Sequence, residues 1–317
     1  MNKFKIHSLL CLTISCDNPE SLKNILLNGL GWDTFSESNI PQNLKKIFNL
    51  NESDNNKFSI FRSQKSDRGM IRILHGKERV RNKQRSLRWG GFEVVVSKDI
   101  DSLFNKLLGF KDFIPISPPE NYDFTDVESN IHRAFSAKLP GGTHATFTMK
   151  LSEPKNRLFP KSNAEVGHIF EIPLNTFNYE KTKNFYENTL GLKKILELVS
   201  NNGPLHKSWK IPVGEKYSIG IFKSSGADSG FGSVEIHGCR KIFLDQELNN
   251  KNEIDGGACI ATFAVENIMN LYECLKKLDI VLTPIDKIEE HPYNGSLSFI
   301  TKGPNNEKIE FVQGWAI

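Results

Sequence analysis

The chain has 317 residues, of which 38% are hydrophobic and 25% are charged, as in an ordinary globular protein. At roughly 100–200 residues per domain, this length predicts two domains. The formal net charge is +4, and no apolar run approaches the roughly 18 residues of a spanning helix, so the composition excludes disordered and membrane-spanning chains.

The first elements are predicted near the N-terminus. Residues 6–15 are rich in apolar side chains and predict a strand. Asn18 and Pro19 have the residue types of a helix N-cap and a first helical position. Strands are expected near 57–63 and 70–74. Because the N-terminal segment alternates and then starts a helix, without a small-residue cleavage site, we expect no signal peptide and a cytoplasmic protein.

The same order then repeats along the chain. We predict a strand at 92–97, a helix at 99–108 and a hairpin formed by 133–139 and 144–151. The second half repeats this order twice. The predicted helices are 179–189 and 267–277, and the predicted strands are 167–174, 216–223, 233–237, 259–265, 297–301 and 308–313.

The two halves of the chain are similar in sequence. Residues 24–32 match 184–192, and residues 61–69 match 222–230, at an offset of about 160 residues. Further matches follow in the same order, so we infer an internal duplication. The polar, proline-containing segment after Leu151 predicts a boundary. We therefore expect domains at 1–152 and 166–317, joined by a linker at 153–165.

A basic segment and the cysteines give little indication of function. Residues 77–88 hold six basic residues and one acidic residue. Such a loop could contact phosphates, but it has no interleaved aromatic residues, so we interpret it as a solvated connector and expect no nucleic-acid partner. The five cysteines form no Cys-x-x-Cys pair, and we expect reduced thiols.

Four strand–helix–strand–strand–strand units resemble the vicinal oxygen chelate superfamily, which includes glyoxalase I, bleomycin-resistance proteins and type I extradiol dioxygenases. The most family-like segments are 167–173, 184–192 and 303–313. The resemblance implies an α+β protein with two tandem domains, each made of two βαβββ modules whose sheets curve into a cup. Substrate and metal would sit inside a cup, and the resemblance favours the C-terminal domain.

The dioxygenase branch implies a particular set of metal ligands. Two His from first strands and one Glu from a last strand would hold non-haem Fe(II) with open coordination positions. His168 and Glu310 lie where the first His and the Glu are expected. Ile260 occupies the place of the second His, beside Cys259, and Ile300 occupies the place of a Tyr that assists catalysis. Two of the four expected groups are therefore missing.

Other residues could complete the site. His237, or Glu235 on the same strand, together with His168 and Glu310 would suit a Zn, Ni or Mn Lewis acid. The alternative is that His237 is a structural His beside a glycine turn, because His75 occupies the matching place in the first half.

The expected site also includes groups for substrate binding and proton transfer. Glu310 would be a general acid or base if it lay in a metal-free cup. His291 and Tyr293 lie near the place of substrate-binding residues in the dioxygenases, although the plain interpretation of this segment is a loop. Residues expected to line the cup are Glu171, Ile260 and Ile300.

Two functions follow from these observations. The first is a divergent enzyme of this superfamily acting on a small organic substrate, with Fe, Zn, Mn or Ni as the divalent metal. The alternative is a metal-free protein that binds or sequesters a small molecule, like the bleomycin-resistance proteins. We expect a small-molecule partner and no membrane partner, and the sequence leaves room for a homo-oligomer.

Overall fold

The structure is a computed structural model of the whole chain. The residues that it describes are 4–16, 18–47, 57–64, 66–74, 88–123, 131–152, 159–200, 206, 211–224, 232–240 and 257–314. The matched His75, almost all of the basic segment 77–88 and much of the linker 153–165 lie outside the described residues.

Four modules repeat the order strand, helix and three strands, as the sequence predicted. The first half contains module 1, with β1 (Lys5–Ser15), α1 (Pro19–Asn24), β2 (Asp33–Asn39), α2 (Gln42–Ile47), β3 (Lys57–Arg62) and β4 (Met70–Leu74), and module 2, with β5 (Gly91–Val96), α3 (Ile100–Leu107), β6 (Ile114–Asp123), β7 (Ile131–Lys138) and β8 (His144–Lys150). The second half contains module 3, with β9 (Val166–Thr176), α4 (Tyr179–Asn184), β10 (Lys193–Ser200), β11 (Tyr217–Lys223) and β12 (Ser233–Gly238), and module 4, with β13 (Gly257–Glu266), α6 (Ile268–Lys276), β14 (Asp286–Ile288), β15 (Ser296–Lys302) and β16 (Lys308–Val312).

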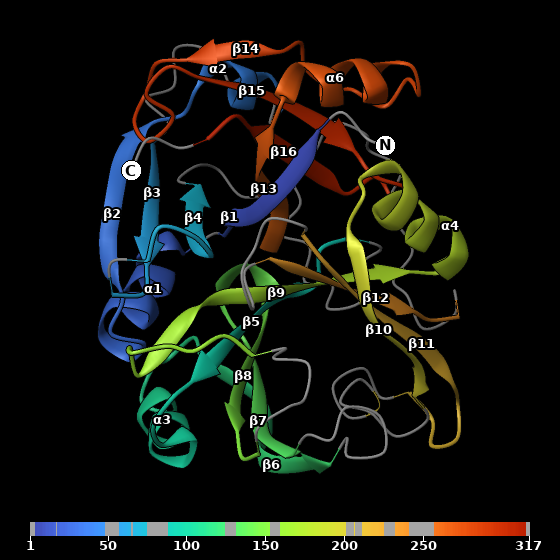
Figure 1. Cartoon of the computed structure of the whole chain (residues 1–317). Helices are drawn as coiled ribbons and strands as arrows, with labels where there is room; N and C mark the ends of the chain where they lie inside the picture. Colours follow the sequence, from blue (N-terminus) through green and yellow to red (C-terminus); the bar gives the residue numbers. More distant parts are fainter. Residues whose placement is uncertain are drawn as a thin grey trace.

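The strands form two eight-stranded sheets, which lie one above the other in Figure 1. Sheet A has the order β14-β15-β16-β13-β1-β4-β3-β2, and sheet B has the order β10-β11-β12-β9-β5-β8-β7-β6. Each sheet curls into a half-barrel, which confirms the expected fold class of α+β with βαβββ modules forming cups.

The modules pair across the halves of the chain. In sheet A, β1 of module 1 lies antiparallel to β13 of module 4. In sheet B, β5 of module 2 lies antiparallel to β9 of module 3. The sequence analysis expected the two modules of one half to share a cup, whereas each observed cup takes one module from each half. The duplication pattern is the same for either pairing, so it could not distinguish them.

Local sequence accounts for the helix starts. Asn18 accepts a hydrogen bond from the Ser21 amide, and Asn178 does the same for Lys181, so both Asn side chains cap a helix as expected of this residue type. Each helix is followed by a π-helical turn, η1 (Ile25–Gly29) after α1 and η3 (Phe185–Thr189) after α4. The shared irregularity supports the inferred duplication.

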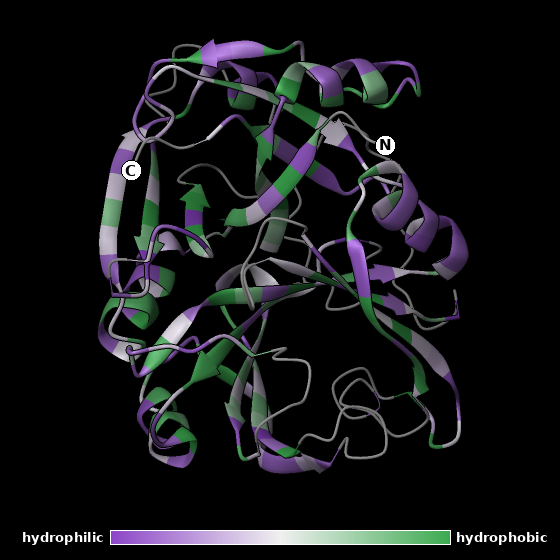
Figure 2. Cartoon of the chain, viewed as in Figure 1, coloured by the Kyte–Doolittle hydropathy of each residue, from purple (hydrophilic) through white to green (hydrophobic). Residues whose placement is uncertain are grey.

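One apolar core joins the helices to both sheets. It includes Leu22, Leu103 and Leu271 from three helices, and Leu12 and Ile172 from the two sheets. Figure 2 shows hydrophobic stretches alternating with hydrophilic ones along α3 and α6, as expected for helices that bury one face. All five cysteines are free thiols. No helix in the described ranges is long and apolar enough to cross a membrane.

The sequence analysis did not predict the second strands β2, β6, β10 and β14, nor the short helix α2. All four strands are sheet edges, and β2 and β10 have few buried residues. An edge strand faces solvent on more than one side, so it needs little of the apolar alternation by which strands are recognised.

Candidate metal and substrate site

The concave side of sheet A is filled by side chains. An apolar cluster there includes Ile60, Met70, Ile260 and Ile300, with Leu44 from α2 packed onto it. Ile260 and Ile300 are fully buried within this cluster. They therefore pack in a core and do not line an open cup, contrary to the expected substrate-binding role.

A buried ion pair lies within this packing. Arg72 on β4 and Glu310 on β16 are both fully buried, with Arg72 Nη2 2.9 Å from Glu310 Oε2. Glu310 also accepts hydrogen bonds from Thr262 at 2.7 Å and from Ser298 at 3.1 Å. Every oxygen of this carboxylate is therefore held by the protein. We infer that Glu310 is a structural residue and that the guanidinium of Arg72 supplies its counter-charge.

Tyr293 belongs to the same network. Its hydroxyl donates to Glu310 at 2.7 Å and accepts from Arg72, and the side chain is fully buried. His291 is exposed and lies against the ring of Phe35, with ring centroids 5.5 Å apart. The structure thus brings Tyr293 to Glu310, as expected, but places His291 outside the network.

The concave side of sheet B holds a cavity of about 120 Å³. Its lining is partly apolar and aromatic, and includes Phe92, Phe170, Leu196 and Ile219. The lining also carries carboxylates, imidazoles and hydroxyl groups. An apolar cavity of about 150 Å³ holds one benzene molecule, so this cavity limits a ligand to about that size.

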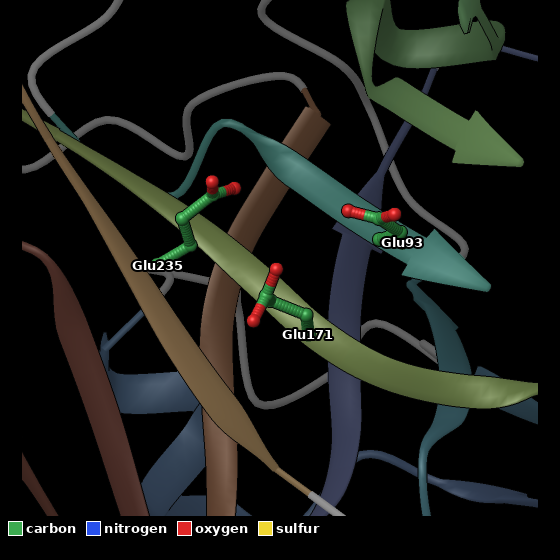
Figure 3. Close-up of side chains that lie close together, drawn as sticks. All are labelled: Glu93, Glu171 and Glu235. Atoms are coloured by element: carbon green, nitrogen blue, oxygen red, sulfur yellow. The ribbon is translucent and has the colours of Figure 1, made fainter. Parts of the chain in front are cut away.

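Three glutamates of the lining converge. Glu93 comes from β5, Glu171 from β9 and Glu235 from β12, and carboxylate oxygens of the three lie within 4.8 Å of one another. Figure 3 shows the three side chains projecting to the same side of these neighbouring strands. At an effective dielectric constant near 20, two such charges 4 Å apart repel by roughly 4 kcal/mol. A nearby cation or bound protons would relieve this repulsion.

Neighbouring side chains orient two of these carboxylates. The hydroxyl of Thr148 donates to Glu93. His237 Nε2 lies 3.0 Å from Glu235 Oε2. Burial raises the pKa of Glu235, but the adjacent His237 outweighs it and brings this pKa below its usual value. Glu235 is therefore ionised at neutral pH.

Two further histidines line the cavity. Burial lowers the pKa of His132 and of His144 to about 4, so both rings are neutral at neutral pH. The ring of His132 contacts those of Tyr122 and Phe159, with centroids 5.8 Å and 5.4 Å away. These three rings all line the cavity.

His168 lies elsewhere on β9. It is 6% exposed, and burial lowers its pKa to about 4, with the charges of Asp67 and Arg68 nearby. Because Glu310 belongs to sheet A and His237 to sheet B, the structure does not assemble the expected metal ligands His168, His237 and Glu310. The cause is the pairing of module 3 with module 2, which sends Glu310 to the other cup.

Sequence reasoning found part of the cavity and missed the rest. Glu171, His237 and Glu235 were identified as candidates and do lie in one cavity. Glu93 in this cavity and Arg72 in the packed interior of sheet A were missed. The available signal was a single charged residue inside an otherwise apolar strand, as in Gly91–Val96 and Met70–Leu74. Such residues usually face solvent, and only the module pairing shows that these two do not.

The three carboxylates fit a divalent cation. Carboxylate oxygens suit hard or borderline ions such as Mn²⁺ and Mg²⁺. Among the described residues, these three form the one group of three or more His, Cys, Asp or Glu side chains whose ligand atoms come so close together.

Comparisons with known proteins identify structures with a similar fold. No family model matches the sequence, and no curated protein matches it. Among solved structures, glyoxalase I from Zea mays aligns with a TM-score of 0.65 and 11% identity over 98% of this chain and 92% of that one. A candidate dioxygenase from Bacillus subtilis subsp. subtilis str. 168 aligns with a TM-score of 0.61 and 12% identity over 97% and 85% of the two chains. The chain therefore has the vicinal oxygen chelate fold that its sequence pattern suggested.

Proposed function

We propose that the protein is an enzyme that acts on a small organic molecule in the cavity of sheet B, with a divalent cation held by Glu93, Glu171 and Glu235. The observation that carries the proposal is the convergence of these three buried or half-buried carboxylates in the lining of a cavity. Bound there, the cation would act as a Lewis acid and polarise an oxygen of the substrate.

The side chains around the cavity have distinct roles in this proposal. Thr148 and His237 fix the orientation of Glu93 and Glu235, as partners of metal ligands commonly do. Phe92, Phe170 and the other apolar residues of the wall bind the carbon skeleton and exclude water. The ligand is accordingly a compact molecule with one oxygen-bearing end and one apolar end.

Metal analysis of untagged protein, purified without chelators, tests this proposal. We expect the purified protein to contain about one divalent ion per chain, or to take up one Mn²⁺ on titration. A single site made of three carboxylates requires this stoichiometry. Glu171→Gln should weaken this uptake by more than about tenfold. Glu197→Gln changes a carboxylate of the sheet edge that is held by Lys183 and Lys194, and is the matched control. Failure of the wild-type protein to take up any divalent ion would overturn the proposal.

The aromatic lining favours a second candidate, a metal-free binding protein for an organic cation. Tyr122, Phe159 and Phe170 line the same cavity as the three carboxylates, and aromatic faces and carboxylates both attract ammonium groups. Protein that takes up no metal but binds butylamine or tetramethylammonium, with affinity lost in Glu171→Gln, would establish this function in place of the first.

A further inference from the structure

His144 is the first residue of β8 and lines the sheet B cavity. It is paired in register with Gly91 at the start of β5. A Cβ atom at Gly91, where φ is +155°, would lie 1.7 Å from the carbonyl oxygen of His144. The absence of a side chain there lets the two strands approach closely, and so fixes the backbone that carries the imidazole.

The Nε2 atom of His144 is buried and has no hydrogen-bond partner among the described residues. Buried polar atoms in folded proteins nearly always have a partner. His144 lines a cavity large enough for a small molecule, so the missing partner is expected to come from the contents of the cavity.

The position of His144 differs from that of a metal ligand. The three carboxylates lie within 4.8 Å of one another, and His144 does not join that group. The charged or titratable groups that act on it are His237 and Glu235. A neutral imidazole beside a carboxylate cluster cannot replace the cation, but one ring nitrogen can donate a hydrogen bond and the other can accept one.

We propose that Nε2 of His144 forms a hydrogen bond with the ligand in the cavity, at a polar atom other than the oxygen that faces the cation. The inference rests on the proposed function and adds a specificity requirement to it. A ligand needs two polar groups at its oxygen-bearing end, one for the cation and one for His144. Molecules with only one such group leave Nε2 unsatisfied and bind more weakly.

The test uses the whole chain, Mn²⁺ and acetohydroxamate, a small ligand with two oxygens and one N–H. The affinity for Mn²⁺ is measured by electron paramagnetic resonance, and the affinity of the Mn²⁺-loaded protein for acetohydroxamate by calorimetry. His144→Leu removes the polar atom and fills a similar volume. His144→Gln places an amide near the position of Nε2, whereas the shorter His144→Asn does not reach it.

We expect all three variants to bind Mn²⁺ within about twofold of wild type, because His144 is not a ligand in this account. His144→Leu and His144→Asn should bind acetohydroxamate at least about tenfold more weakly, and His144→Gln within about threefold of wild type. The matched control is His7→Leu, which removes a partly exposed histidine of β1 in sheet A, outside the cavity, and should leave the affinity for acetohydroxamate unchanged.

Unchanged acetohydroxamate affinity in folded, Mn²⁺-loaded His144→Leu would overturn the role of His144 and leave the proposed function intact. The same holds if His7→Leu lowers the affinity as much as His144→Leu does, because the effect would then not come from the cavity. Absence of Mn²⁺ binding by the wild-type protein would overturn the proposed function, and this inference with it.

Discussion

Sheets A and B are built from equivalent modules, yet the interiors of their cups differ. The cup of sheet A is packed with apolar side chains around the Arg72–Glu310 ion pair. The cup of sheet B contains a cavity with three converging carboxylates. In sheet A the protein neutralises its buried carboxylate with its own guanidinium. In sheet B three acidic groups face a cavity that can admit a cation.

The comparison indicates how a duplicated fold can separate stability from function. A buried carboxylate whose counter-charge is a side chain of the same protein stabilises one folded state. A bound molecule cannot displace that side chain. A cluster of carboxylates around a cavity is unfavourable by itself and is relieved by a ligand. The following predictions test this contrast, from the largest expected effect to the smallest.

The largest effect is expected from Arg72→Met. This change leaves Glu310 buried without its counter-charge, and removing one partner of a buried ion pair costs about 3–5 kcal/mol of unfolding free energy. Urea denaturation measures the loss. Arg62→Met is the control, because its pair with Asp33 is partly exposed and contributes only about 0–1 kcal/mol. Equal losses in the two variants would contradict the structural role of the buried pair.

The next effect concerns a buried carboxyl group that joins the two sheets. Glu307 of module 4 accepts a hydrogen bond from Tyr186 of module 3, and burial raises its pKa from 4.5 to about 7. The folded chain therefore holds a proton between pH 4.5 and 7 that the unfolded chain has released. The contribution of Glu307 to stability is fully present below the unfolded pKa and falls as pH rises through this window, by about 3 kcal/mol.

Glu307→Gln should remove this pH dependence, because the amide keeps one acceptor and one donor and cannot ionise. The measurement is the free energy of unfolding at pH 5 and at pH 8 for both proteins. Glu20→Gln changes an exposed carboxylate and should leave the difference in place. If the difference in stability between the two pH values were the same in Glu307→Gln as in the wild type, Glu307 would not titrate in this range.

A smaller change in stability is expected from Glu171→Gln in the cup of sheet B. In metal-free protein the loss of one charge relieves repulsion, so stability should rise by on the order of 1 kcal/mol. The affinity for Mn²⁺ should fall by more than the roughly tenfold loss typical of a residue that only supports a ligand. Destabilisation of the metal-free protein would mean that repulsion among the three carboxylates does not limit its stability.

The smallest effect is expected from Thr148→Val, which removes the hydroxyl that donates to Glu93. We expect the affinity for Mn²⁺ to fall about tenfold, since the carboxylate loses its orientation but not its charge. Thr146→Val, on the same strand and also lining the cavity, is the control. If both variants bind Mn²⁺ as the wild type does, Thr148 does not position Glu93.

Much of the fold could be predicted from the sequence. The repeat of strand, helix and three strands, the helix caps at Asn18 and Asn178, and the hairpins of modules 2 and 4 follow from local composition. These features depend on residues close in the chain. The pairing of β1 with β13 joins segments about 250 residues apart, and no local pattern records it.

The same limit explains the outcome for the site. Glu171, Glu235 and His237 could be identified because they lie near a family-like segment or beside each other on one strand. Glu93 could not be joined to them without knowing that β5 lies next to β9. Glu310 was expected to bind a metal because it follows a family-like turn. Its partner Arg72 lies more than 200 residues away, which concealed the ion pair.

The most direct test of the central claim is a crystal structure of the protein with Mn²⁺, using anomalous scattering to locate the ion. The account predicts one strong peak between the carboxylates of Glu93, Glu171 and Glu235, and none beside the Arg72–Glu310 pair. A peak bound elsewhere, or carboxylates of the sheet B cavity that stay without an ion at saturating Mn²⁺, would contradict it.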